Sequence, residues 1–115
     1  MTDLLQTHKD VQAVFAANDA MIMGAIAALR AQGIPLSRVV TVGCDAEAEA
    51  LRAVKEGRLT ASIESFPGEQ ARTALRLLVG KARDGRDPPS KEVNIAPMAI
   101  DKANVDKAEK KDPTP

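Results

Sequence analysis

Three short apolar runs that stop abruptly at polar side chains constrain the fold of this chain more than any other feature. The runs cover residues 11–17, 39–43 and 59–63, and most of their residues are β-branched or otherwise apolar. Such runs are typical of buried strands. The side chains that follow the three runs are Asn18 and Asp19, then Cys44 and Asp45, then Glu64 and Ser65. If the strands are parallel, these side chains lie along one edge of the sheet, where open α/β folds bind their ligands.

Helical patterns separate the runs and cover residues 20–32 and 46–56. Either Asn18 or Asp19 can cap the first helix, and Asp45 is well placed to cap the second. The alternation of strand and helix predicts consecutive right-handed βαβ units. The predicted fold class is therefore α/β, with a parallel sheet flanked by helices. The first strand is apolar enough to be covered on both faces.

The alternation of strand and helix ends after the third run. A helix is predicted for residues 68–81, but no sheet surface in the chain is evident for its apolar side chains. The run at 93–100 is interrupted by Pro97, which predicts an edge or crossover strand. From there the chain becomes charged and rich in alanine, which predicts a short surface helix near residues 103–110 and a frayed end.

The composition argues against several classes of function. A chain of 115 residues suffices for one modest domain. Its 16 basic residues balance its 16 acidic residues, so no net field attracts nucleic acid or an anionic membrane. A single cysteine cannot form an internal disulfide, and a single histidine cannot build a metal site with it. The sequence contains no glycine-rich phosphate loop, and no cofactor is expected.

The N-terminal residues lack the basic start and the long apolar centre of a signal peptide. No apolar run reaches the length of a membrane span. Taken as it stands, the chain is expected to carry no export signal.

Each polar strand end has a structural interpretation beside a functional one. Asn18, Asp19 and Asp45 can cap helices, and Glu64 and Ser65 can simply end a strand. The functional interpretation is that amide and carboxylate groups at one sheet edge bind vicinal hydroxyls, donating to some oxygens and accepting from others.

Catalysis is not expected from these residues. The only histidine, His8, precedes the first strand and lies far from Cys44, so a Cys–His nucleophile is a weak hypothesis. Asp45 and Glu64 could be imagined as the paired carboxylates of a glycosidase, but nothing else in the sequence supports that chemistry. The chain is therefore predicted not to be an enzyme and not to bind a metal.

Three segments together carry a resemblance to a known family. They are AVFAANDAM at 13–21, VGCD at 42–45 and KEGRLTASI at 55–63. In this order and spacing they resemble the C-terminal part of periplasmic sugar-binding proteins, which are the ribose-binding-like, type I receptors of ABC transporters. The resemblance extends over nearly the whole chain, to residue 106.

In that family two Rossmann-like lobes close over a sugar, and three strands cross between the lobes at a hinge. The resemblance implies that residues 1–65 are the later part of the C-terminal lobe. Residues 66–90 resemble a helix and loop that belong to the N-terminal lobe, and residues 91–102 resemble the returning crossover strand of the hinge. Residues 103–115 are then a short helix and a disordered tail. The resemblance also implies that the N-terminal lobe and the start of this lobe are absent from the chain.

The resemblance also assigns roles to single residues. Asn18 matches the family's sugar-binding amide, and Asp45 matches its carboxylate that binds hydroxyls. Ser65 stands where an amide near the hinge often completes the pocket. Cys44 takes a pocket position at which an aromatic or other large residue is common. The other strand-end residues are assigned as helix caps or rim residues: Asp19 and Glu64.

The expected function is therefore that of the periplasmic, substrate-capturing component of an ABC transporter, which binds a monosaccharide and signals its presence to a membrane permease. The chain alone should bind weakly or not at all, because half a cleft cannot desolvate a sugar. One alternative is the effector domain of a LacI-type repressor, which has the same fold. Another is a fragment that binds no ligand and self-associates through its helix at 67–82.

Overall fold

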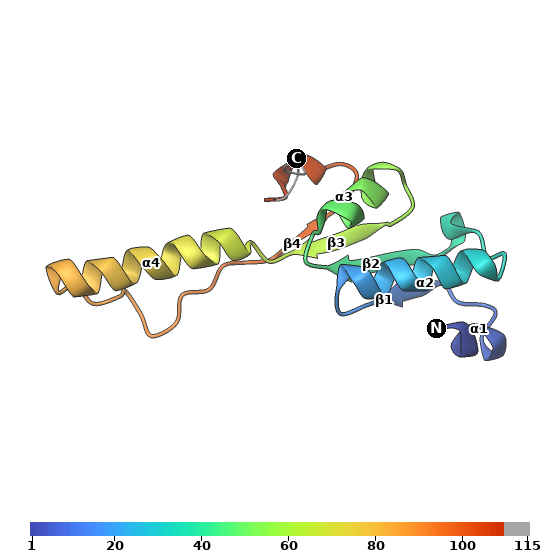
Figure 1. Ribbon diagram of the computed structural model, residues 1–115, viewed down its shortest axis with the longest axis horizontal. Coiled ribbons are helices and arrows are strands. Elements are labelled where there is room, and N and C mark those ends of the chain that lie inside the picture. The colour runs from blue at the N-terminus through green and yellow to red at the C-terminus, as the bar shows by residue number, and fades with distance from the viewer. Residues whose placement is uncertain (110–115) are drawn as a thin grey trace.

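The computed structural model describes residues 1–109. Its elements follow one another in the order α1 (Thr2–Thr7), β1 (Ala13–Phe15), α2 (Asp19–Ala31), η1 (Leu36–Arg38), β2 (Val40–Cys44), α3 (Ala48–Lys55), β3 (Ala61–Glu64), α4 (Pro67–Asp84), β4 (Met98–Ile100) and η2 (Val105–Lys107), as Figure 1 shows. The two η elements are single 3-10 turns.

The four strands form one sheet in the order β1-β2-β3-β4. The first three are parallel, with Phe15 opposite Val42 and Cys44 opposite Ile63. β4 runs antiparallel to β3, with Ala99 opposite Ile63. The predicted α/β class and the parallel arrangement of the first three strands are therefore confirmed, and the carboxyl ends of these three strands lie along one edge.

Helices α2 and α3 cover the same face of the sheet. Each connects two neighbouring parallel strands, and right-handed crossovers that proceed in one direction place both helices on one side. Their buried residues form a single cluster with residues beside the strands: Ala16, Ile22, Ala25, Ile26, Ala50, Ala53, Val54 and Leu59. A second cluster joins Ile100 of β4 to Leu51 of α3 and to Ala108.

The opposite face of the sheet is open over β1 and β2. Phe15 and Val40 expose 69% and 51% of their surface. The expectation that the run at 11–17 is covered on both faces is therefore wrong for this chain. The reason is that β1 lies at the edge of the sheet, and both crossover helices pack against the other face.

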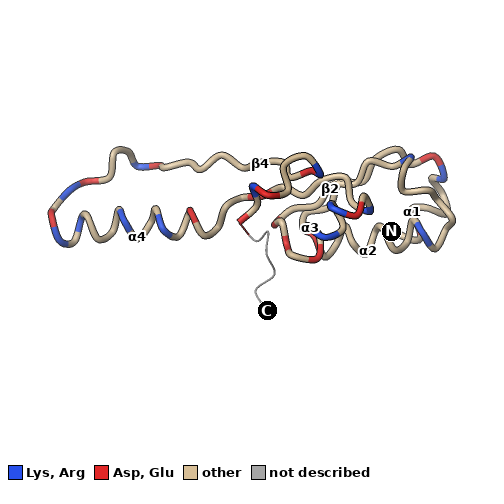
Figure 2. Tube along the Cα trace, turned by 90° about the horizontal axis from the view of Figure 1, so that it is seen from above, with Lys and Arg blue, Asp and Glu red and all other residues tan. Residues whose placement is uncertain are grey.

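Helix α4 projects away from the sheet, and the segment at 85–97 runs back beside it (Figures 1 and 2). None of its 18 residues is buried. The chain is consequently elongated, with extents of 60 × 30 × 22 Å and a radius of gyration of 18.3 Å, whereas a compact chain of this length would have about 13 Å. As the sequence indicated, no sheet surface within residues 1–109 covers the apolar side chains of this helix.

Several predicted boundaries are corrected by the structure. The run at 93–100 pairs only at Met98–Ile100, because Pro97 has no amide hydrogen to donate to a ladder. The helix expected near 103–110 is reduced to η2, because Asp101 and Asn104 bond to nearby backbone amides and close a turn instead. The frayed end predicted for residues 112–115 lies outside the described residues.

Candidate functional site

The candidate site is the edge at which β1, β2 and β3 end. Asn18 follows β1 by three residues, and Asp45 and Ser65 follow directly after β2 and β3. The register of the three strands brings these positions to the same edge, as the sequence predicted. The three side chains therefore share one surface, to which each contributes a polar group.

Asn18 both caps α2 and offers a donor. Its Oδ1 accepts a hydrogen bond of 2.9 Å from the backbone N–H of Met21, so the cap of this helix is Asn18. The assignment of Asp19 as that cap was wrong. Within residues 1–109 the Nδ2 group of Asn18 has no partner, and the side chain is half-buried. Its amide is therefore held in place by the helix and is available to donate.

Asp45 does not cap α3 as the sequence predicted. The helix begins only at Ala48, and the residue at its N-cap position is Glu47. Asp45 instead has φ 98°, in the left-handed region, and Ala46 follows with φ 47°. The Asp45 side chain is exposed, and in the described part of the chain its carboxylate accepts no hydrogen bond. The turn therefore carries a free acceptor at the end of β2.

A buried side-chain network lies beneath this turn. Asp19 and Ser62 are 2% and 0% exposed, and the Ser62 hydroxyl donates to Oδ1 of Asp19 at 2.7 Å. The N–H of Ala46 donates to Oγ of Ser62 at 3.0 Å, and the N–H of Glu47 donates to Oδ2 of Asp19 at 2.7 Å. These two side chains and their bonds are called the Asp19–Ser62 network below. The interpretation of the sequence did not include this network.

Gly43 has no side chain, and this leaves room for the network. A Cβ at Gly43 would lie 2.3 Å from Oδ1 of Asp19 and 2.6 Å from Cγ2 of Ile22. A glycine within a strand often marks such a close approach, and this signal in the sequence could have revealed the contact. Burial raises the pKa of the Asp19 carboxyl, the bonds from Ser62 and the Glu47 amide lower it, and the nearby charges of Asp45 and Glu47 raise it.

Cys44 belongs to the other face of the sheet. Along β2, Thr41 and Gly43 are buried under the helices, whereas Val40, Val42 and Cys44 alternate toward the open face. Burial raises the pKa of the Cys44 thiol, and the charges of Asp45 and Asp19 raise it further. The thiol is therefore protonated at neutral pH, which does not favour a nucleophile.

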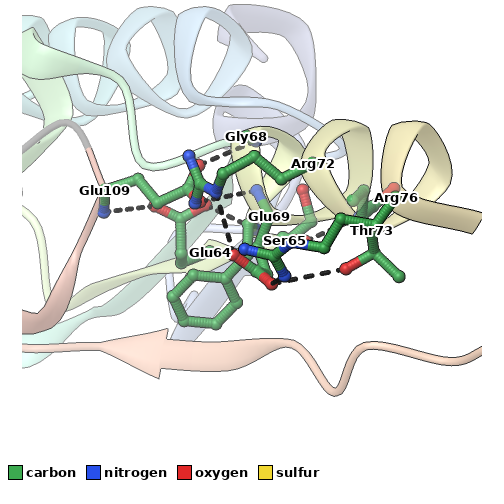
Figure 3. Close-up of polar contacts among 10 residues, drawn as sticks. Glu64, Ser65, Gly68, Glu69, Arg72, Thr73, Arg76 and Glu109 are labelled. Carbon is green, nitrogen blue, oxygen red and sulfur yellow. Dashed lines mark hydrogen bonds and ion pairs between the residues drawn. The ribbon is translucent and has the colours of Figure 1, made fainter. Parts of the chain in front are cut away.

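Glu64 and Ser65 form the part of the edge that leads into α4, as Figure 3 shows. Glu64 is 1% exposed. Its Oε1 accepts from the N–H of Phe66 at 2.8 Å and its Oε2 from the N–H of Glu109 at 3.1 Å. The assignment of Glu64 as a cap or rim residue is corrected on this point: the carboxylate is buried, because it lies on the covered face and two amides bind it.

Ser65 is half-buried, and its carbonyl accepts from Nε2 of Gln70 at 2.6 Å. In residues 1–109 its hydroxyl has no partner. The next residue, Phe66, has φ 54° and turns the chain sharply into α4. The hydroxyl of Ser65 is thus available where the sheet leads into the projecting helix.

Glu109 binds the first turn of α4 (Figure 3). Its oxygens accept from the N–H groups of Gly68 and Glu69, both at 2.9 Å, and Nη2 of Arg72 lies 3.1 Å from Oε1. A hydrogen bond from Arg72 lowers the pKa of the Glu69 carboxyl. The C-terminal segment is therefore fastened at the root of the helix, where the unpaired amides of a helix favour a carboxylate.

Other features of the described residues offer fewer polar groups for binding a ligand. An open groove lies between α4 and the segment that returns beside it, lined by residues such as Ala74, Leu77 and Val93. Within residues 1–109, no group of three or more His, Cys, Asp or Glu side chains could hold a metal ion. No helix in that range is both long and apolar enough to cross a membrane.

Comparisons with known proteins identify the family of the chain. The family model described as "Periplasmic binding protein domain" matches residues 1–87. The chain is 39% identical over 92 residues to the ribose import binding protein of Escherichia coli, an alignment that covers 76% of this chain and 30% of that protein. It is 33% identical over 88 residues to the D-allose-binding periplasmic protein of the same organism, covering 76% and 28%. The chain thus spans less than a third of these relatives.

Two solved structures extend the match to the fold. The Caulobacter myo-inositol binding protein, crystallised with myo-inositol, superposes with a TM-score of 0.81 and 36% identity, and the match covers 94% of this chain and 36% of that one. A periplasmic ribose ABC transporter protein of Conexibacter woesei gives a TM-score of 0.83 at 26% identity, covering 92% and 35%.

Proposed function

Because the chain belongs to the family of periplasmic binding protein domains, we propose that the edge formed by Asn18, Asp45 and Ser65 is one wall of a sugar-binding cleft. The observation that carries this proposal is that, among residues 1–109, all three side chains keep polar atoms without a hydrogen-bond partner at the ends of adjacent parallel strands. The ligand would be a monosaccharide. The relatives named above as ribose- and allose-binding proteins support this class of ligand.

The three groups differ in what they can exchange with a hydroxyl-rich ligand. The amide of Asn18 donates, and the carboxylate of Asp45 accepts from two hydroxyls or from a vicinal pair. The hydroxyl of Ser65 can do either. A mixed set of this kind suits a sugar, in which each hydroxyl both donates and accepts. No step of bond making or breaking is needed, and the proposed role is binding without catalysis.

The division of the chain follows from the same proposal. Residues 1–65 would be the later part of one lobe, and residues 66–90 would be a helix and loop that pack on the other lobe. Residues 91–102 would cross back through the hinge, and residues 103–109 would return to the first lobe, where Ala108 packs with Leu51 and Ile100. The projection of α4 away from the sheet, with no buried residue, supports this division.

In the whole protein, closure of two lobes over the sugar would signal its capture to the membrane permease of an ABC transporter in the periplasm. Cys44 would line the cleft only from the open face of the sheet, so its contribution is the smallest of the proposed contacts. The isolated chain would bind weakly or not at all, and it would associate with further copies through the exposed leucines of α4.

The proposal is tested by calorimetric titration of the full-length gene product with D-ribose, D-allose and myo-inositol. Asn18→Ala and Asp45→Ala should each weaken binding of the preferred ligand by about 1–3 kcal/mol, the cost of leaving a buried partner unpaired. The matched control is Asp10→Ala, an exposed residue before β1. Unchanged affinity in the Asn18 and Asp45 variants would refute these assignments, and the absence of heat with every ligand would refute the proposed ligand class.

A further inference from the structure

We infer that Asp19 and Ser62 are positioning residues, which touch no ligand but hold Asp45 in its binding conformation. The inference rests on the proposed role of Asp45 in sugar binding. It extends that role to two residues on other elements, Asp19 at the start of α2 and Ser62 in β3. Hydrogen bonds beneath the surface of the site then connect the segments that follow β1 and β2 to β3.

The first step is that three successive backbone amides of the turn are fixed. The N–H of Asp45 donates to the carbonyl of Ile63 at 2.9 Å. The next two amides, of Ala46 and Glu47, donate to the hydroxyl of Ser62 and the carboxylate of Asp19 at 3.0 and 2.7 Å. Because strand pairing holds only the first amide, the Asp19–Ser62 network supplies the hydrogen bonds that hold the other two.

The second step is that the turn needs such restraint. Asp45 and Ala46 have φ values of 98° and 47°, in the region that residues other than glycine rarely adopt. A short turn with two such residues would relax toward another conformation if its amides were free. The direction in which the Asp45 side chain leaves the end of β2 depends on the φ angle of Asp45 itself, and the network holds that angle by fixing the two amides that follow.

The third step is that neither Asp19 nor Ser62 can bind the ligand itself. Both are almost completely buried. Each oxygen of the Asp19 carboxylate already accepts one bond, and the Ser62 hydroxyl donates one and accepts one. A ligand at the surface of the edge therefore meets Asp45 and never reaches the network.

The hydrogen bonds of the network also have a donor–acceptor order that an asparagine side chain at position 19 cannot reproduce. Ser62 accepts from Ala46, so its proton must point to an acceptor, and Asp19 must accept from both Ser62 and Glu47. In Asp19→Asn the amide group supplies one acceptor atom where two are needed. One of the two bonds is lost even though the shape of the side chain is kept.

The experiment compares Asp19→Asn and Ser62→Ala with a matched control, Thr41→Val. Thr41 is buried in β2, and its hydroxyl accepts from the N–H of Thr60 at 3.2 Å. The control therefore removes the same kind of bond from the same sheet, but at the amino end of the strand. Ser62→Thr keeps the hydroxyl and serves as the rescuing variant.

Two readouts are made on each variant. The first is amide hydrogen exchange at Ala46 and Glu47, together with the three-bond HN–Hα coupling of Asp45, which reports its φ angle. We expect exchange at these two amides to become about tenfold faster than any change in global stability explains. The Asp45 coupling should change as well. Thr41→Val and Ser62→Thr should leave these values as they are.

The second readout is the affinity of the full-length gene product for its preferred sugar, which should fall about tenfold in Asp19→Asn and Ser62→Ala but not in the other two variants. Unchanged local exchange and coupling in both variants would overturn the inference. A loosened turn with unchanged affinity would overturn it too. If no sugar binds even the unaltered protein, the proposed function fails, and the exchange and coupling data still show whether the network holds Asp45.

Discussion

Replacing Gly43 by alanine should destabilise the chain by about 3 kcal/mol or more. The added Cβ would lie 2.3 Å from Oδ1 of Asp19 and 2.6 Å from Cγ2 of Ile22, about 1 Å inside the usual contact distance. β2 cannot move aside, because it is paired with β1 and β3 on both sides. The carboxylate must therefore move, and the bonds from Ser62 and Glu47 weaken as it does.

The magnitude combines two costs. Overpacking of a tight interior costs about 1–3 kcal/mol, and a hydrogen bond to a charged group contributes about 1.5–3 kcal/mol. Together these costs are a large share of the 5–15 kcal/mol that is typical for a domain. The change should therefore be visible as a clear shift of the urea midpoint.

The chain has no tryptophan and no tyrosine, so intrinsic fluorescence is a poor probe of its unfolding. The methyl NMR signals of Ile22 and Ile26 are suitable, because both residues lie in the cluster under the sheet and not in α4. Gly24→Ala is the matched control: nothing lies within 4 Å of a Cβ there, and alanine in a helix interior should stabilise by about 0.5–1 kcal/mol. A loss below about 1 kcal/mol for Gly43→Ala would refute the reasoning.

Two further predictions concern charge and association. Burial raises the pKa of Asp19 above its ordinary 3.8, so the folded chain retains a proton that the unfolded chain has released. Stability should therefore decline as the pH rises from about 3.8 through the folded-state pKa. Urea titrations should show this decline in the unaltered chain but not in Asp19→Asn, and parallel curves would contradict it. The chain should also associate with rising concentration in sedimentation experiments, because Leu75 and Leu78 are 61% and 65% exposed. Changing both to Glu should abolish association, whereas Leu4→Glu, in α1, should not, and an unaltered chain that stays monomeric would count against the idea.

Sequence patterns were sufficient for the parallel sheet and for the common edge of Asn18, Asp45 and Ser65, because each strand end is marked by a change from apolar to polar residues. They could not decide between Asn18 and Asp19 as the cap, since both residue types cap helices equally well. The choice depends on Ser62, which binds Asp19 across 43 positions of sequence.

Glu64 was misassigned for a similar reason. A carboxylate after an apolar strand is usually exposed, but one of the amides that bind it belongs to Glu109, 45 positions away. The positive φ of Asp45 was also not predictable, because it is rare outside glycine and follows from the network rather than from local preference. Ser62 and Glu64 alternate with apolar residues along β3 and so lie on one face of the strand. This pattern was the available signal of a buried polar layer.

The edge that carries Asp45 is firmly held, whereas helix α4 projects from the sheet as an arm. This difference bears on why the isolated chain should bind poorly. The turn at Asp45 is fixed from below by Asp19 and Ser62, which belong to the sheet layer. Helix α4 buries no residue, and the contacts at its root come from Glu109 and Gln70, beside Ser65. None of these hydrogen bonds reaches Asp45, and Ala108, which precedes Glu109, packs with Ala46 within the sheet layer, so the orientation of the arm and the direction of that carboxylate should be independent. Weak binding by the isolated chain would then arise from contacts that the opposite wall has to supply, and not from disorder of this wall. The Asp45 coupling constant should accordingly be the same in the isolated chain and in the full-length gene product, and a difference between the two would show that the second lobe shapes the turn.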